Sequence, residues 1–195
     1  MQLTLYKHSV APMSTFRGLH ERLGFAGLDR VDLPLVCALV TGDPLLLVGT
    51  HGTAKSALVR SLSRALDLRF HAYDASKSMF EDVLGFPDPT SLAKGELRYV
   101  PTPISLWDKE MVLIDEISRA TPSMQSKWLE IVRGRRVMGL EAQRLKYVFA
   151  AMNPPQYAGA VPLDAALAGR FAWVVKMPDT ASLPDAALAS VVRTV

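Results

Sequence analysis

The chain of 195 residues is poor in several features that would assign it to a particular class of protein. Its single cysteine, Cys37, excludes an internal disulfide, and because Cys37 lies in an apolar run we expect a small buried hydrophobic residue. This cysteine usage fits a reducing compartment, so we predict a cytoplasmic location. No apolar stretch is long enough to span a bilayer, which predicts a soluble protein without a membrane partner.

A strong excess of charge of one sign is also missing. The net charge is +3, and the basic residues are spread along the chain apart from a small cluster at Arg133, Arg135 and Arg136. This balance does not by itself indicate a nucleic-acid partner. About half of the residues are apolar (49%), which suits one domain with a sizeable core.

What the sequence does contain is an alternation of short apolar runs with amphipathic segments. Near-continuous apolar strands separated by helices are typical of a parallel sheet covered on both faces, so we predict an α/β fold, a three-layer α/β/α sandwich around a mostly parallel five-stranded sheet. The predicted strands are Leu45–Val48, Leu68–Tyr73, Met111–Ile114, Tyr147–Met152 and Phe171–Val175. The predicted helices span residues 33–41, 55–66, 76–84, 122–133 and 163–168.

Two stretches do not fit a simple alternation of strands and helices. Residues 85–110 are rich in glycine and proline around a short strand-like segment, which predicts an inserted loop or hairpin that projects from the sheet. Residues 134–146 have a similar turn-and-strand character. Insertions of this kind are frequent binding sites for partners.

The most informative segment is residues 44–56, where an apolar strand runs into a turn that ends in Lys55 and Ser56. It nearly matches the P-loop motif G-x-x-x-x-G-K-[ST], with Ala54 in place of the second glycine. In a P-loop, backbone N–H groups surround a phosphate, the lysine reaches the β- and γ-oxygens, and the hydroxyl ligates Mg²⁺. Because Ala54 directly precedes the predicted helix, we expect it to be right-handed and little strained.

A second candidate motif is the apolar strand that ends in Asp115 and Glu116. In a P-loop nucleotidase the strand beside the P-loop strand ends in an Asp that holds Mg²⁺ opposite the Ser or Thr hydroxyl. The following Glu can orient or deprotonate an attacking water. Paired acids are also common as helix caps, but after a P-loop in a parallel sheet they favour a metal site at the carboxyl ends of the strands.

Two further polar residues follow the last two predicted core elements. Asn153 ends a strand, where it can hydrogen-bond a γ-phosphate between the two nucleotide motifs or form an Asx turn before the prolines. Arg170 ends a helix, where it can reach the γ-phosphate of a neighbouring subunit or interact with its own helix C-terminus.

These motifs, in this order, resemble those of AAA+ ATPases with the P-loop NTPase fold, and within them the MoxR group. The segments that carry the resemblance are Gly52–Ser56, Gly95–Ile104, Asp115–Ala120, Met152–Pro154 and Gly169–Phe171. The similarity covers about residues 24–178, and its middle segments are fairly specific to the group.

The resemblance implies ATP and Mg²⁺ as cofactors, a homo-oligomeric hexameric ring, and chaperone-like remodelling of a protein partner, often with a von Willebrand A-domain protein. It implies that Lys55 and Ser56 form Walker A, Asp115 and Glu116 Walker B, Asn153 sensor 1 and Arg170 the arginine finger, with Ser56 and Asp115 holding the metal. Arg119 matches a group motif and lies at a subunit interface or on the plain surface. The expected nucleotide-binding residues are Gly49, Thr50, His51, Gly52, Thr53, Ala54, Lys55, Ser56 and Ala57.

The resemblance also divides the chain. Residues 1–23 are expected to form an N-terminal extension, 24–178 the ATPase core with a helix-2 insert at about 85–103 facing the ring's pore, and 179–195 a linker or the start of a lid. The group usually has Pro at the position of His51 and Asp at that of Gly169. Since the lid and its sensor 2 Arg have no complete counterpart here, we expect weak nucleotide binding and slow hydrolysis.

Three functions are compatible with these observations. The leading hypothesis is an ATPase core that remodels or activates a protein partner. A nucleotide-gated scaffold with little or no turnover is the alternative, motivated by the incomplete lid and by His51. A nucleic-acid motor, suggested by the arginine cluster, is the least favoured, because basic residues at a helix end usually form a solvated surface.

Overall fold

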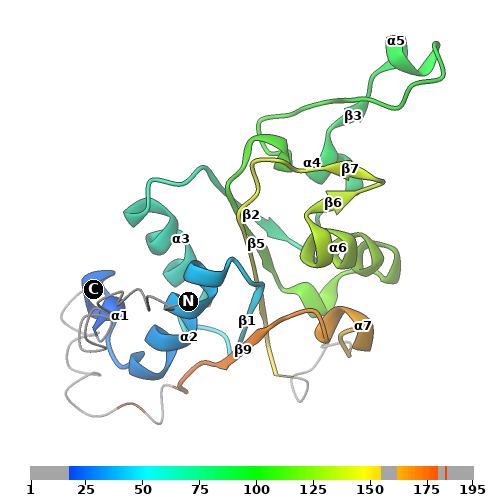
Figure 1. Cartoon of the computed structure of the whole chain (residues 1–195). Coiled ribbons are helices and arrows are strands. Elements are labelled where there is room, and N and C mark those ends of the chain that lie inside the picture. The colour runs from blue at the N-terminus through cyan, green and yellow to red at the C-terminus, as the bar shows by residue number, and fades with distance from the viewer. Residues whose placement is uncertain (1–17, 155–161, 180–182, 184–195) are drawn as a thin grey trace, which may run out of the picture.

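The computed structural model describes residues 18–154, 162–179 and 183. Its centre is a five-stranded sheet with the order β2–β5–β8–β1–β9, in which each pair of neighbours is parallel (Figure 1). The strands are β1 (Leu45–Val48), β2 (Phe70–Asp74), β5 (Met111–Asp115), β8 (Tyr147–Met152) and β9 (Trp173–Lys176). All five predicted strands are confirmed, with ends that shift by no more than two residues.

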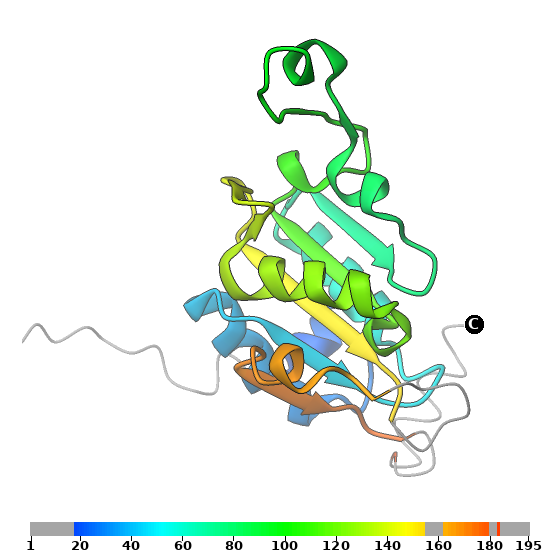
Figure 2. The same cartoon turned by 90° about the vertical axis from the view of Figure 1, so that its right-hand side faces the viewer.

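Helices cover both faces of this sheet, because alternate strand residues point to opposite sides. Leu45 and Leu47 belong to the hydrophobic cluster on the side of α2 and α3, whereas Leu46 belongs to the cluster on the side of α6 and α7. Figure 1 shows the sheet edge-on between these layers, and Figure 2 shows α6 and α7 in front of it. The layers consist of α1 (Leu19–Arg22), α2 (Asp29–Thr41) and α3 (Lys55–Ala65), and of α6 (Pro122–Gly134) and α7 (Ala165–Ala168). The predicted three-layer sandwich is therefore confirmed.

Local capping explains where the helices begin. Thr121 accepts a hydrogen bond from the Met124 N–H and Pro122 occupies the first turn, so α6 starts as predicted. The α7 helix starts at Ala165, two residues later than expected, because the Asp164 carboxylate caps the N–H groups of Ala166 and Leu167.

Among the described residues, no helix has the length and apolar composition that crossing a membrane requires.

Two predicted helices have different starting points in the structure. The α4 helix (Phe80–Leu84) begins four residues later than predicted, because Asp74 accepts hydrogen bonds from the N–H and hydroxyl of Ser76 and forms a turn there. The α2 helix begins four residues earlier, at Asp29. The carboxylate of Asp32 accepts hydrogen bonds from the N–H groups of residues 18–20 and so joins α1 to α2.

Both predicted insertions form antiparallel hairpins. The insert hairpin pairs β3 (Phe86–Pro87) with β4 (Tyr99–Val100) and carries the short helix α5 (Pro89–Leu92) at its projecting end (Figures 1 and 2). At its base Gly85 has φ +85°, and a Cβ there would lie 2.1 Å from the Val100 carbonyl oxygen, so only glycine fits. The second hairpin pairs β6 (Arg136–Val137) with β7 (Leu140–Glu141).

Two 3₁₀ turns complete the described elements, η2 (Leu106–Asp108) before β5 and η3 (Ile117–Arg119) after it. Residues 1–17 of the predicted N-terminal extension lie outside the described residues, as do residues 180–182 and 184–195 of the predicted linker or lid.

Candidate nucleotide-binding site

Three predicted motifs meet at the carboxyl ends of the central strands. The loop after β1 carries Lys55, β5 ends in Asp115, and Asn153 follows β8. One expectation is wrong: β8, and not β5, lies next to β1. The chain crosses from β1 to the far edge strand β2 and returns through β5 and β8 before it reaches β9 on the other side of β1, so Asn153 comes to lie between the P-loop and Asp115.

Lys55 is the first residue of α3, and only 7% of it is exposed. Its Nζ donates hydrogen bonds to the carbonyl oxygens of Gly49 (2.7 Å) and Thr50 (2.9 Å) and to Asn153 Oδ1 (3.3 Å). Burial lowers the pKa of this ammonium, and the negative charges of Asp115 and Glu116 oppose that shift. The charged lysine is thus held in the loop by polar groups that an incoming anion can replace.

The loop itself has the shape of an anion cradle. Gly52 has φ +79°, and a Cβ built there would meet nothing within 4 Å. Among the described residues, the N–H groups of Gly52, Thr53 and Ala54 donate to no protein acceptor, although Thr53 is only 7% exposed. A cavity of about 310 Å³ opens over this loop. It is lined by residues 51–57, Asp115 and Glu116. Unpaired N–H groups that face a cavity are the donors that a phosphate requires.

Ala54 contradicts the expectation of a relaxed, right-handed residue. It has φ 61° and ψ 16°, which is the left-handed conformation, and it directly precedes α3. A side chain with a Cβ costs roughly 1–2 kcal/mol in this region, so the substitution of the usual glycine stores strain in the loop. The backbone has to change direction between the loop and the helix. The left-handed conformation of Ala54, directly before Lys55, makes that change.

The donor set for a divalent cation is assembled beside the lysine. Ser56 Oγ donates a short hydrogen bond to Asp115 Oδ2, and Asp115 Oδ1 accepts from the Glu116 N–H at 3.0 Å. Within the described part of the chain, no cluster of three or more His, Cys, Asp or Glu side chains forms a closed metal cage. One hydroxyl and one carboxylate suit Mg²⁺, which keeps several waters and takes its other ligands from phosphates.

Glu116 lies in a hydrogen-bonded network at the same strand ends. Its two carboxylate oxygens each accept from Asn153 Nδ2 at 3.1 Å, and its Oε2 lies 3.3 Å from Arg119 Nε. His51 Nε2 lies 3.1 Å from Asn153 Nδ2. Glu116 is 37 positions from Asn153 in the sequence and His51 is 102 positions from it, yet all three share one cluster. No spacing in the sequence indicates this.

The two remaining candidates are placed differently. Arg119 is partly exposed and pairs with Glu116, so it belongs to the network above. Arg170 is exposed in the turn after α7, where its N–H donates to the Leu167 carbonyl oxygen. Within the described residues, no hydrogen bond or ion pair joins Arg170 to the P-loop or to the two acids, so it does not act on this chain's own site in this arrangement.

The parallel sheet, the phosphate loop, the acid-tipped strand and the intervening asparagine together define a P-loop nucleotide-binding domain of the AAA class. The chain belongs to the family described as AAA domain (dynein-related subfamily), whose model matches residues 44–171, more than half of its length.

The chain is also similar to other proteins in sequence and in fold. YeaC of Bacillus subtilis, an uncharacterized protein, is 29% identical over 177 residues, which cover 88% of this chain and 54% of YeaC. The crystal structure of a candidate ATPase from Cytophaga hutchinsonii matches with a TM-score of 0.66 and 24% identity, over 89% of this chain and 52% of that one. The Hsp104–ADP complex of Saccharomyces cerevisiae matches with a TM-score of 0.58 and 14% identity, over 89% of this chain and 30% of that one. The chain thus spans about half the length of the curated relatives that it matches.

Proposed function

We propose that this chain is an ATP-binding and hydrolysing AAA+ core of MoxR type, which couples Mg²⁺-dependent ATP hydrolysis to the remodelling or activation of a protein partner. The observation that carries the proposal is the convergence of Lys55, the Ser56–Asp115 pair and Glu116 on one cavity. Asn153 hydrogen-bonds to both Lys55 and Glu116. Membership of the AAA family supports nucleotide binding, and ADP bound to the similar Hsp104 fits it.

Binding of the triphosphate uses groups that are already oriented. Among the residues that the structure describes, the N–H groups of residues 52–54 donate to no protein acceptor, so they are available to donate to phosphate oxygens. Lys55 Nζ exchanges its contacts with the Gly49 and Thr50 carbonyl oxygens for the phosphate, which replaces neutral acceptors by charged ones. The helix dipole of α3 adds to this attraction because its N-terminus points at the cradle.

Ser56 and Asp115 are the residues that would hold Mg²⁺. When bound, Mg²⁺ neutralises charge on the β- and γ-oxygens during phosphoryl transfer. Glu116, next along the chain, is then the base that orients or deprotonates the attacking water. Asn153 holds the side chains of both Glu116 and Lys55 in position through hydrogen bonds.

The decisive experiment compares wild type with Glu116→Gln. We expect the variant to bind ATP with an affinity close to that of wild type but to lose phosphate release by about 100-fold or more, since general-base catalysis contributes 10²–10⁴-fold. Titration with ATP in the presence of Mg²⁺ measures the affinity, and a phosphate-release assay measures the turnover. Undiminished hydrolysis by the Gln variant removes the role proposed for Glu116.

A nucleotide-gated scaffold is the second candidate, and one observation favours it. Glu116 is held by Asn153 and Arg119 here, so that its carboxylate is engaged by partners other than water. The same phosphate-release assay, run on this chain and on one extended beyond Val195, separates the two functions. If neither shows hydrolysis that depends on Glu116, the scaffold stands.

A nucleic-acid motor receives no support from the arginine cluster. Arg135 donates to the carbonyl oxygens of Gly42 and Lys146, and Arg136 pairs with Glu141. Two of the three arginines are therefore engaged within the fold. Binding to duplex DNA that weakens steeply with salt would restore this function.

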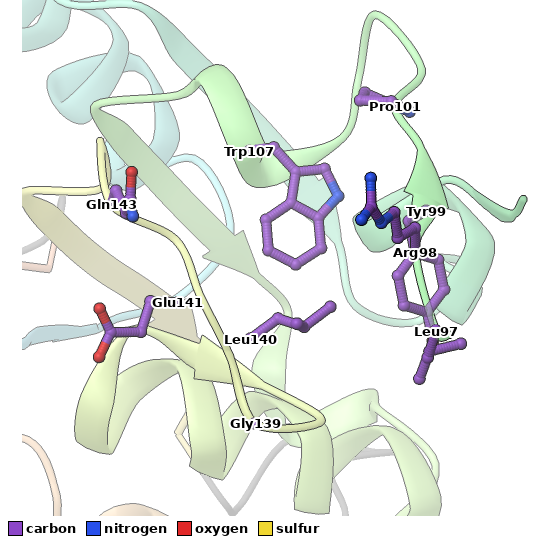
Figure 3. A pocket seen from close by; sticks show the side chains of 9 residues that line it. All are labelled: Leu97, Arg98, Tyr99, Pro101, Trp107, Gly139, Leu140, Glu141 and Gln143. Atoms are coloured by element: carbon purple, nitrogen blue, oxygen red, sulfur yellow. The ribbon is translucent and has the colours of Figure 1, made fainter. Parts of the chain in front are cut away.

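The partner is proposed to contact the two hairpins. A cavity of about 480 Å³ lies between them (Figure 3). Its apolar lining comes from both hairpins and the η2 turn, and includes Leu97, Tyr99, Trp107 and Leu140. The centroid of the Tyr99 ring lies 6.4 Å from that of the Phe80 ring and 6.3 Å from that of the Trp107 ring. These ring contacts fix the base of the insert hairpin. The occupant that fits is an extended polypeptide segment with an apolar side chain, as expected of a remodelled protein or a von Willebrand A-domain partner.

The role of the hairpins is tested by Leu97→Ser combined with Leu140→Ser. We expect the basal ATPase to stay within about twofold of wild type, since surface substitutions change little, while stimulation by a von Willebrand A-domain protein is lost.

Light scattering with an ATP analogue and Mg²⁺ tests ring formation. Arg170→Ala should lower turnover only in the assembled form.

A further inference from the structure

The imidazole of His51 belongs to the P-loop but points at the two residues proposed to handle the γ-phosphate and the water. Its Nε2 lies 3.1 Å from Asn153 Nδ2, and its Nδ1 lies 3.9 Å from Glu116 Oε1. Asn153 is 2% exposed, so its polar atoms depend on protein partners.

The orientation of the Asn153 amide is fixed by its other neighbours. Its Oδ1 faces the Lys55 ammonium at 3.3 Å, and its Nδ2 faces both oxygens of Glu116 at 3.1 Å. A flipped amide would place N–H groups against the ammonium and a carbonyl oxygen against the carboxylate, and both contacts would be repulsive. Nδ2 is therefore the atom that faces His51, and it can only donate.

This assignment determines the proton on the imidazole. Because Nδ2 donates, His51 Nε2 has to accept, and in a neutral ring the proton then resides on Nδ1. The Nδ1–H points toward Glu116 Oε1 across 3.9 Å, which is too long for a direct hydrogen bond but favourable as an electrostatic contact. The ring thus presents its donor to Oε1 of the Glu116 carboxylate and its acceptor to the Asn153 amide.

We propose that His51 is a positioning residue of this site: as a neutral Nδ1–H imidazole it accepts from Asn153, and so holds the Asn153–Glu116 pair in the geometry for hydrolysis. This inference rests on the proposed ATPase function. The side chain acts through Asn153 and not on the phosphate, so its removal should change turnover and leave nucleotide affinity in place.

Two readouts test the proposal, and the first needs no activity. Long-range ¹H–¹⁵N NMR of the nucleotide-free chain reports which ring nitrogen of each histidine carries the proton, and the signals missing from His51→Gln identify those of His51. We expect the Nδ1–H tautomer. The Nε2–H tautomer would overturn the proposal, whether or not the chain hydrolyses ATP.

The second readout compares two variants of similar size. His51→Gln keeps an acceptor and a donor on one planar group, whereas His51→Leu keeps neither. We expect the Leu variant to lose about tenfold in kcat, as loss of one hydrogen bond to an aligned group implies, with the affinity for a non-hydrolysable ATP analogue unchanged within about twofold. The Gln variant should recover most of the kcat.

The outcomes separate this inference from the proposed function. Equal kcat values in wild type, Gln and Leu variants contradict the positioning role, and so does a parallel loss of kcat and affinity in both variants, which a distorted loop would produce. If Glu116→Gln hydrolyses ATP as wild type does, the role proposed for Glu116 is refuted, and the tautomer then decides the His51 contact alone.

Discussion

The two ends of the central strands differ in how they use polar and apolar side chains. At the carboxyl ends, Lys55 and Glu116 both hydrogen-bond to Asn153, and Asp115 accepts a hydrogen bond from Ser56. At the amino ends, the insert hairpin and the β6–β7 hairpin leave large apolar side chains in solvent. These exposed residues include Phe86 (59%), Leu92 (49%), Leu97 (40%) and Val100 (51%).

This difference suits the two ends of the sheet to different kinds of contact. Buried charges have to be fully paired, so the phosphate end is constrained in geometry and suited to chemistry. Exposed apolar groups that cost free energy in water are expected at surfaces that bind another protein. The strands β5 and β8 connect the two ends directly.

The largest effect should come from the core behind the phosphate loop. Leu58 in α3 is fully buried, so Leu58→Ala should lower the free energy of unfolding by about 2–5 kcal/mol. Leu92→Ala at the exposed end of the insert hairpin should change it by no more than about 0.5 kcal/mol. Urea unfolding of both variants measures the contrast, and similar losses would contradict the picture of a projecting hairpin end that lies outside the core.

Lys55→Ala should weaken binding of an ATP analogue by about 100-fold, because charge-assisted hydrogen bonds to phosphate are each worth roughly 1.5–3 kcal/mol. Lys77, whose side chain is 83% exposed and pairs with Asp74, provides the matched control. Lys77→Ala should bind as wild type does. Calorimetric titration gives both affinities, and a small effect at Lys55 would mean that the N–H groups of the loop dominate binding.

The strain at Ala54 predicts two opposite effects of glycine in neighbouring positions. Ala54→Gly relieves the left-handed conformation and should stabilise the fold by about 0.5–1 kcal/mol after the entropic cost of glycine. Ala57→Gly, in the right-handed helix α3, should destabilise it by up to about 1 kcal/mol. Thermal unfolding of the pair measures the two signs. Destabilisation by both variants would argue against a strained loop.

The smallest effect should be a pH dependence at β2. Burial, and then the charges of Lys109 and Arg60, lower the pKa of His71 below 6.5, and Asp82 opposes this shift. The stability that depends on neutral His71 is therefore present above pH 6.5 and is lost as the pH falls toward the lower pKa of the folded state, since the unfolded chain binds more protons there. Replacing His71 by Gln should flatten this part of the stability profile. An unchanged profile would assign the slope to other groups.

Much of the fold was predictable because its signals are local. Each core strand is a continuous apolar run, and Thr121 with Pro122 marks the start of α6. The predictions failed where a side chain redirects the backbone. Asp74 bonds to Ser76 and delays α4, and Ala54 reverses the chain before Lys55. Neither effect has a periodic signature.

The candidate site was predictable as a set of residues but not as a network. The P-loop pattern and the acid pair identify Lys55, Ser56 and Asp115 from spacing alone, because phosphate and Mg²⁺ chemistry restricts the residue types. The contacts of Glu116 with Arg119, and of Asn153 with His51, depend on which strands are neighbours. Strand order is a property of the whole sheet.

The sequence by itself determined the alternation of strands and helices, the presence of two inserted hairpins and the chemical groups available for a nucleotide. The expected place of Asn153 between the two nucleotide motifs follows from β8 lying between β1 and β5. The tertiary structure alone decided that its one amide faces a lysine, a glutamate and a histidine at once. The physical reason is that apolar periodicity fixes how each segment buries its own surface, whereas the packing of all segments together fixes which of their ends meet.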